Sequence, residues 1–263
     1  LRFEQVVRMP DPVGVGGILR LLGDNPELIA GARWRNISRD TGAAGIVVSD
    51  RGQLQLRGWT GGFRAQLDAG VAPGAWSRMQ LTAAGAGDIR QFSVDSLRLS
   101  GPEVTVTGQG LLNHVAGLRG AFSLQGRRID LRPVDARLAG KIDFDGQLGF
   151  DPAGSFSFLL RDAKGTLFGR QFRASGTVAN AEVGYAFDEV RVQAGGNRLD
   201  IDGIWGPALS GRFSIDAPDL ATLWPGLEGY LHGKGTLGGS SGKPEFELEL
   251  DGRGLGLGAL RVD

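Results

Sequence analysis

Cysteine is absent from this chain of 263 residues, and histidine and tyrosine occur only twice each. Without cysteine there are no disulfides and no thiolate chemistry, although this does not fix the compartment. The two histidines, His114 and His232, are far apart and have no partner pattern nearby, so we interpret them as ordinary strand or loop residues. No apolar run reaches the length of a membrane-spanning helix, and no signal peptide is visible.

Neither sign of charge is in excess, since lysine plus arginine and aspartate plus glutamate both number 29. A net charge of zero gives no electrostatic argument for a nucleic-acid partner. Proline is scarce at 11 residues, whereas glycine reaches 45 residues, well above its usual share. The glycines have no three-residue period and separate apolar runs, which excludes collagen and argues against a disordered linker.

Catalytic and metal-binding motifs are also missing. The carboxylates of Asp143 and Asp145 suggest a calcium loop, but the glycine and glutamate that an EF-hand needs downstream are absent. Residues 233–238 match G-x-G-x-x-G, but the residues that follow cannot open the helix of a dinucleotide site. The sequence therefore predicts a non-enzymatic protein with no cofactor and no metal site.

The chain is rich in period-two alternation. In Phe246–Leu250, apolar residues alternate with glutamates, which predicts a strand with one dry face and one wet face. From residue 33 onward, a pattern of apolar, polar, apolar, any residue and glycine recurs. Its clearest copies are Leu54–Gly58, Val104–Gly108, Ile142–Gly146 and Leu199–Gly203. At one strand per roughly 10–12 residues, we expect an all-β antiparallel meander of about twenty strands.

Helix is expected mainly near the N-terminus. Residues 13–32 contain a compact apolar patch, and Asn25 can cap a short helix from Pro26 to Ala30. We favour a helical turn packed on the end of a sheet, and the alternative is a plug or a membrane-surface helix. Short turns are expected near 88–92 and 219–223.

The candidate functional residues are the apolar members of the alternating runs, because they should point to one shared interior. They are Leu54, Leu56, Val104, Val106, Ile142, Phe144, Phe156, Phe158, Leu199, Ile201, Phe213, Ile215, Phe246, Leu248 and Leu250. Their carboxylate neighbours should face water. Arginines within the runs, such as Arg98 and Arg191, are interpreted as solvated charge that discourages aggregation. Binding of anionic headgroups along an edge is the alternative.

A D-L-x-x-L turn followed by spaced proline, leucine and glycine positions runs through the tail, residues 219–263. The positions are Asp219, Leu220, Leu223, Pro225, Leu227, Gly229, Leu231, Gly238, Pro244, Phe246, Leu248, Leu250, Leu255, Leu257 and Val262. This arrangement resembles the repeating motif of the TamB family, the AsmA-like inner-membrane subunits of the bacterial translocation and assembly module. The resemblance is good over the tail and diffuse over the rest of the chain.

The resemblance implies a β-taco, a long antiparallel sheet curled into a U with an apolar interior. It also implies a periplasmic location in a Gram-negative bacterium and a parent protein anchored in the inner membrane by a helix outside this segment. The implied partners are phospholipid acyl chains and an outer-membrane barrel of the Omp85 type, the latter bound through other regions. The implied roles are phospholipid transport between the membranes and outer-membrane protein assembly.

Physical reasoning supports an open groove independently of the resemblance. A long one-sided sheet has a dry face that no helix of this chain is long enough to cover, and large exposed apolar patches mark binding sites. We expect residues 1–263 to form a segment of one elongated β-groove domain, with a short helical element at 13–32 and repeated strands at 33–263. The alternative is a closed β-sandwich or solenoid binding module, such as a secreted adhesin passenger.

Overall fold

The computed structural model describes the chain except for residues 1, 9–12, 21–26, 41–45, 60, 75, 181–183, 224–225, 258–259 and 263. The protein is all-β, and its strands pair antiparallel with their neighbours in the chain. It divides into two compact units, Leu1–Arg127 and Arg128–Asp263. The expected curled antiparallel sheet is confirmed, whereas the assignment of 1–263 to a single elongated domain stays a prediction.

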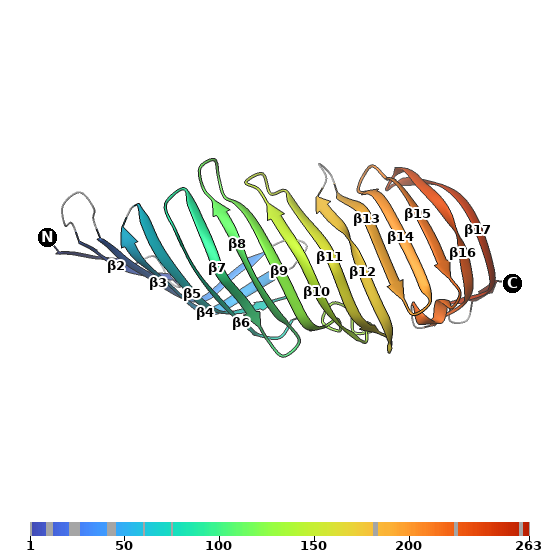
Figure 1. Ribbon diagram of the computed structural model, residues 1–263, viewed down its shortest axis with the longest axis horizontal. Coiled ribbons are helices and arrows are strands. Elements are labelled where there is room, and N and C mark those ends of the chain that lie inside the picture. The colour runs from blue at the N-terminus through green and yellow to red at the C-terminus, as the bar shows by residue number, and fades with distance from the viewer. Residues whose placement is uncertain are drawn as a thin grey trace. The chain divides into compact units, whose positions relative to one another are not determined.

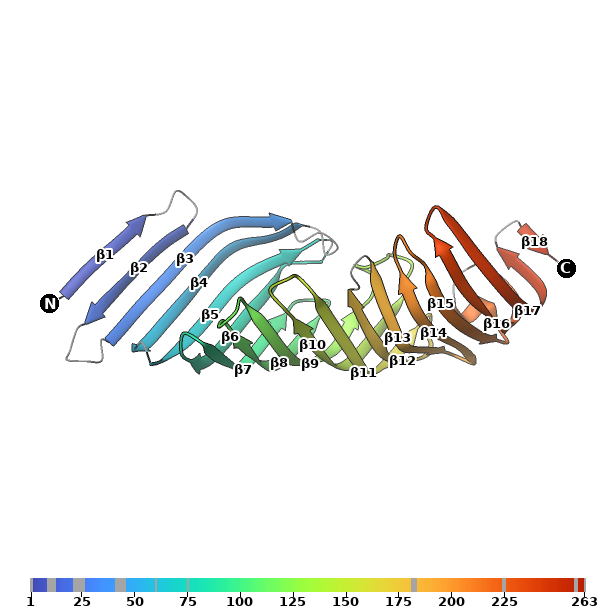
Figure 2. The ribbon, with the colours of Figure 1, turned by 90° about the horizontal axis from the view of Figure 1, so that it is seen from above.

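Strands of the first unit follow one another as a meander, and Figures 1 and 2 show β3 to β8 side by side in chain order. The strands are β1 (Arg2–Arg8), β2 (Val13–Arg20), β3 (Glu27–Asp40), β4 (Ile46–Trp59), β5 (Gly62–Pro73), β6 (Met79–Gly87), β7 (Gln91–Ser100), β8 (Thr105–Asn113) and β9 (Arg119–Asp130). Figure 2 shows that β3 and β4 bend along their length, so the sheet of this unit is curled.

The second unit continues the same pattern. Its strands are β10 (Gly140–Phe150), β11 (Phe156–Leu167), β12 (Arg170–Asn180), β13 (Tyr185–Ala194), β14 (Asn197–Trp205), β15 (Ser210–Ala217), β16 (Leu227–Ser240), β17 (Lys243–Leu257) and β18 (Leu260–Val262). Register shifts interrupt several ladders in mid-strand, for example at Leu160/Ala163 and Phe187/Val190. Such bulges bend a strand and increase its twist, which is how a sheet curls without losing its pairing.

Two aspartates of the recurring apolar-polar-apolar pattern accept hydrogen bonds from the backbone of the neighbouring strand. Arg128 and Glu189 have left-handed backbone, with φ angles of 53° and 49°. The N–H of Arg128 donates to Oδ1 of Asp143 at 2.7 Å, and that of Glu189 donates to Oδ2 of Asp202 at 3.4 Å. A strand that leaves its regular path needs other acceptors for its N–H groups. These aspartates therefore do more than face water.

The predicted helix at 13–32 is wrong. Val13–Arg20 and Glu27–Asp40 are strands β2 and β3, and they pair with each other through Ile18 opposite Ile29; residues 21–26 lie outside the described residues. The physical reason is the composition of β2, VGVGGILR, in which glycine and β-branched residues disfavour helix.

The expected turn at 219–223 is confirmed as a 3₁₀ turn, η2 (Leu220–Thr222), with Leu220 buried. Asn197 holds it in place, because its Nδ2 donates to the carbonyl of Asp219 at 2.8 Å and its Oδ1 accepts from the N–H of the same residue at 3.1 Å. At 88–92 the chain makes a non-helical bend, in which Oδ1 of Asp88 accepts the N–H groups of Arg90 and Gln91.

Burial is shallow throughout the described residues, where eleven apolar residues are buried, four of them alanines. The chain exposes 16813 Å², whereas a compact protein of this mass would expose about 11,000 Å². Much of the apolar surface of the sheet is therefore not covered by a second layer. This argues against the closed sandwich considered as an alternative.

Candidate lipid-binding face

Register links the apolar side chains of the second unit into rows that cross its sheet. Residues directly opposite each other in an antiparallel pair share a face. One row runs Phe144, Ala163, Ala174, Val192, Leu199, Ile215, Gly233 and Leu250. Another runs Leu148, Phe158, Val178, Phe187, Gly203, Gly211, Leu237 and Phe246. Between them, Ile201, Phe213, Gly235 and Leu248 are paired in turn. We call this the apolar face of the second unit.

The first unit has an equivalent apolar face. One of its rows runs Leu54, Leu67, Ala83, Leu97, Gly108 and Leu124, and a second runs Leu56, Ala65, Gly85, Val94, Gly110 and Phe122. A third contains Ala69, Leu81, Leu99 and Val106. Both units thus carry polar and apolar residues on opposite sides of one sheet.

The fifteen candidate residues divide between these two faces. Leu54, Leu56, Val104 and Val106 belong to the first unit, and Val104, just before β8, is buried. The remaining eleven belong to the second unit, and those on β10, β11, β14 and β15 are half-buried. On β17, Phe246, Leu248 and Leu250 are 60%, 51% and 46% exposed. That these residues line a lipid-binding groove stays a prediction.

Glycines on the apolar faces were not among the candidates, yet they shape the lining. A Cβ at Gly235 would lie 2.6 Å from Cδ2 of Leu248 and 2.9 Å from Cε1 of Phe213. A Cβ at Gly110 would lie 2.5 Å from Cδ1 of Phe122. The large side chain of one strand therefore lies directly on the bare backbone of the next, an arrangement known to compensate for glycine in sheets. Gly108, which ends one copy of the five-residue pattern, meets Leu124 in the same way, but no copy of the pattern contains Gly110 or Gly235.

The polar face of the second unit is covered by cross-strand ion pairs. Nζ of Lys234 lies 3.1 Å from Oε2 of Glu249, and a guanidinium nitrogen of Arg191 lies 3.8 Å from Oδ1 of Asp200. A nitrogen of Arg212 lies 3.7 Å from Oδ1 of Asp202. These exposed pairs add little stability. They show that Arg191 has a partner within the sheet, in agreement with its interpretation as solvated charge.

Two carboxylates before β10 have lowered pKa values. The side-chain hydrogen bond from Arg132 holds the pKa of Asp130 at about 2, and Arg137 does the same for Asp135. The distances agree, with Nε of Arg132 at 2.9 Å from Oδ1 of Asp130. Each arginine follows its aspartate by two residues, so the pairs fix the turn that precedes β10.

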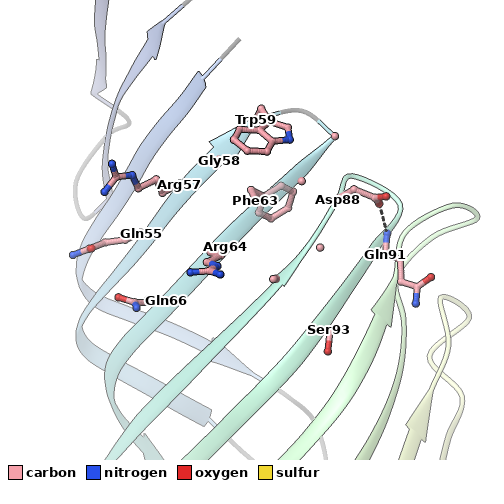
Figure 3. Close-up of a pocket in the computed structure, with 14 residues that line it drawn as sticks. Gln55, Arg57, Gly58, Trp59, Phe63, Arg64, Gln66, Asp88, Gln91 and Ser93 are labelled. Carbon is pink, nitrogen blue, oxygen red and sulfur yellow. Dashed lines mark hydrogen bonds between the residues drawn. The ribbon is translucent and has the colours of Figure 1, made fainter. Parts of the chain in front are cut away.

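A cavity of about 1250 Å³ lies in the first unit, where β4 turns into β5 and β6 into β7. Figure 3 shows Trp59 and Phe63 near the β4 end, with Arg57 and Arg64 below them on neighbouring strands. Gln55 and Gln66 continue the polar lining, and Asp88 accepts the backbone N–H of Gln91 at 2.9 Å. None of the predicted site residues lines this cavity, and no sequence motif pointed to it.

Within the part of the chain that the structure describes, no group of three or more histidines and carboxylates is placed to hold a metal ion. The helical segments described include none with the length and apolarity needed to cross a bilayer.

The geometry defines an open, curled antiparallel sheet protein with one apolar and one polar face. A family model described as "TamB, N-terminal domain" matches residues 18–263. The chain therefore belongs to the TamB family, as the motif in its tail predicted. This is a family of transport and assembly proteins of the Gram-negative envelope, which work with an Omp85-type partner. Comparisons with curated proteins and with solved structures find no significant match.

Proposed function

We propose that this chain binds phospholipid acyl chains on its apolar faces and conducts them between the inner and outer membranes. The observation that carries the proposal is the set of continuous apolar rows on a single-layered sheet, which leave Phe246, Leu248 and Leu250 about half exposed. Exposed apolar surface of this kind usually marks a binding function. Each acyl methylene that such a face removes from water contributes about 0.8 kcal/mol.

The regular lining suits a ligand that slides. Acyl chains have no polar groups below the headgroup, so they need no fixed hydrogen-bonding partners, and the rows offer apolar contact at every strand. A chain with these properties would work in the periplasm, as part of a protein anchored in the inner membrane and joined through other regions to an Omp85-type barrel. Unfolded outer-membrane proteins also expose apolar side chains, so assistance in their assembly is a second role for the same surface.

Site-specific photocrosslinking from β17 tests the proposal. Leu248 and Glu249 are adjacent, and register puts Leu248 on the apolar face and Glu249 on the polar face beside Lys234. A photoreactive residue at 248 should give phospholipid adducts in phospholipid vesicles, whereas the same residue at 249 should give few. Equal yields at the two positions, or none at 248, would refute acyl-chain binding. Peptide adducts at 248, formed with an unfolded barrel protein, would instead support the assembly role.

A further inference from the structure

Arg57 and Arg64 are like charges that lie directly opposite each other on the adjacent strands β4 and β5, and both line the cavity at the β4–β5 turn. Such pairs are destabilising in a sheet. Both side chains are exposed, and neither has a carboxylate partner among the residues described. Other like-charged pairs lie opposite each other in the described sheet, such as Arg35 and Arg51 or Lys164 and Arg173, but neither pair lines this cavity. The first unit thus keeps two cations together that nothing in the described structure neutralises.

The composition of the first unit also points to an anionic ligand. Residues 1–127 contain 14 arginines, no lysine and 10 carboxylates. Arginine is favoured over lysine where a phosphate is bound, because its planar guanidinium donates two parallel hydrogen bonds. The exposed arginines of β3 to β5 also include Arg33, Arg35 and Arg51 on the face that carries the pair.

The cavity beside the pair is lined by residues that register assigns to both faces of the sheet. Phe63 pairs with Gly58 and so lies on the apolar face with Leu56, whereas Arg57 and Arg64 lie on the polar face. All three residues line the cavity, and Trp59, 55% exposed, lies with them at the turn in Figure 3. A ligand with an anionic head and apolar tails fits this combination, since tryptophan favours the boundary between apolar and wet surroundings.

We propose that Arg57 and Arg64 bind the phosphate of a lipid headgroup at the β4–β5 turn, while the acyl chains pass Phe63 onto the apolar face. The inference rests on the proposed function for the acyl chains and adds the site that selects the headgroup. Gln55 and Gln66 provide amide donors for the remaining oxygens of the headgroup. The headgroup thereby stays in water while the tails leave it.

The test compares two double variants of the 263-residue chain with equal loss of charge. Arg57→Gln with Arg64→Gln removes the pair, and Arg98→Gln with Arg119→Gln removes two exposed cations outside the cavity. Binding is measured at physiological salt to phosphatidylcholine vesicles with and without phosphatidylglycerol. The first variant should lose affinity for the anionic vesicles by at least about tenfold, since two charge-assisted interactions disappear. The second variant should change by less than about twofold, because exposed charges outside the site are screened.

Three further measurements decide what the result means. Arg57→Lys with Arg64→Lys keeps the charge but not the bidentate geometry and should recover only part of the loss. Equal losses in the two glutamine variants would overturn the site in favour of diffuse attraction. Inorganic phosphate that binds at the pair as tightly as the vesicles do would overturn the headgroup and leave a free-phosphate site. Lipid adducts from position 248 report acyl-chain contact separately, so the proposed function and the headgroup site can fail independently.

Discussion

A carboxylate in the middle of the apolar face should block lipid without unfolding the sheet, and Ile201→Asp is the sharpest form of this perturbation. Ile201 is half-buried in β14, paired with Val190 of β13 on one side and Phe213 of β15 on the other. Losing the apolar contacts of a half-buried isoleucine costs about 1 kcal/mol. Since one side of the face stays open, the new carboxylate keeps part of its hydration, and we expect a total loss of about 2 kcal/mol.

In a closed core, the same substitution would cause a larger loss of stability. An unpaired carboxylate buried on all sides costs several kcal/mol and usually prevents folding. For a unit of this size, a loss of about 2 kcal/mol lowers Tm by roughly 5–10 °C, whereas a loss of several kcal/mol lowers it by about 20 °C or more. Thermal melts followed by circular dichroism separate these outcomes.

The matched control is Thr236→Asp, which places the same carboxylate on the exposed polar face of β16 opposite Arg212. Its Tm should change by less than about 2 °C, and crosslinking of lipid from position 248 should be unaffected. Ile201→Asp should melt cooperatively and lose the adducts. If Ile201→Asp unfolds, or if it folds and keeps full adduct yield, the reasoning from an open lipid-binding face is refuted.

Three other substitutions test the supporting structure. Gly235→Ala should lower the free energy of unfolding by about 1–3 kcal/mol in denaturant melts, because its Cβ meets side chains at 2.6 and 2.9 Å, whereas Gly238→Ala, with open space, should be nearly neutral. Arg132→Gln should raise the pKa of Asp130 from about 2 toward 3.8 in an NMR titration. The stabilisation that this substitution removes is present above pH 4 and is lost as the pH falls through about 2. The free energies of unfolding of variant and parent should therefore converge in strong acid. Asn197→Ala should cost about 2–3 kcal/mol and speed hydrogen exchange in the η2 turn, and protection that stays unchanged would contradict its anchoring role.

The strands were predictable from the sequence because one face of the sheet is drier than the other. Alternation such as Phe246–Leu250 has only one structural meaning when it recurs at strand length, and it gave the fold class. The sequence of residues 13–32 does not decide between helix and strand, because a short apolar patch fits both, and only the ladder between β2 and β3 distinguishes them.

The remaining features depend on partners that a single strand does not reveal. Asp143 and Asp202 accept N–H groups from residues more than ten positions away, so their role required the register of neighbouring strands. The pair Arg57 and Arg64 is also a product of register, because nothing in the spacing of the two residues shows that they face each other. Sequence periodicity tells which face a residue occupies, and the pairing tells what it meets there.

The contact between Gly235 and Leu248 also constrains how this chain can change over evolution. Since no Cβ fits at position 235 while leucine lies across it, neither position is free to vary alone. A relative with alanine or valine at the position of Gly235 should carry a smaller residue opposite it. Drift along the lining would then proceed by paired replacements across the ladder, with the sum of the two side-chain volumes kept nearly constant.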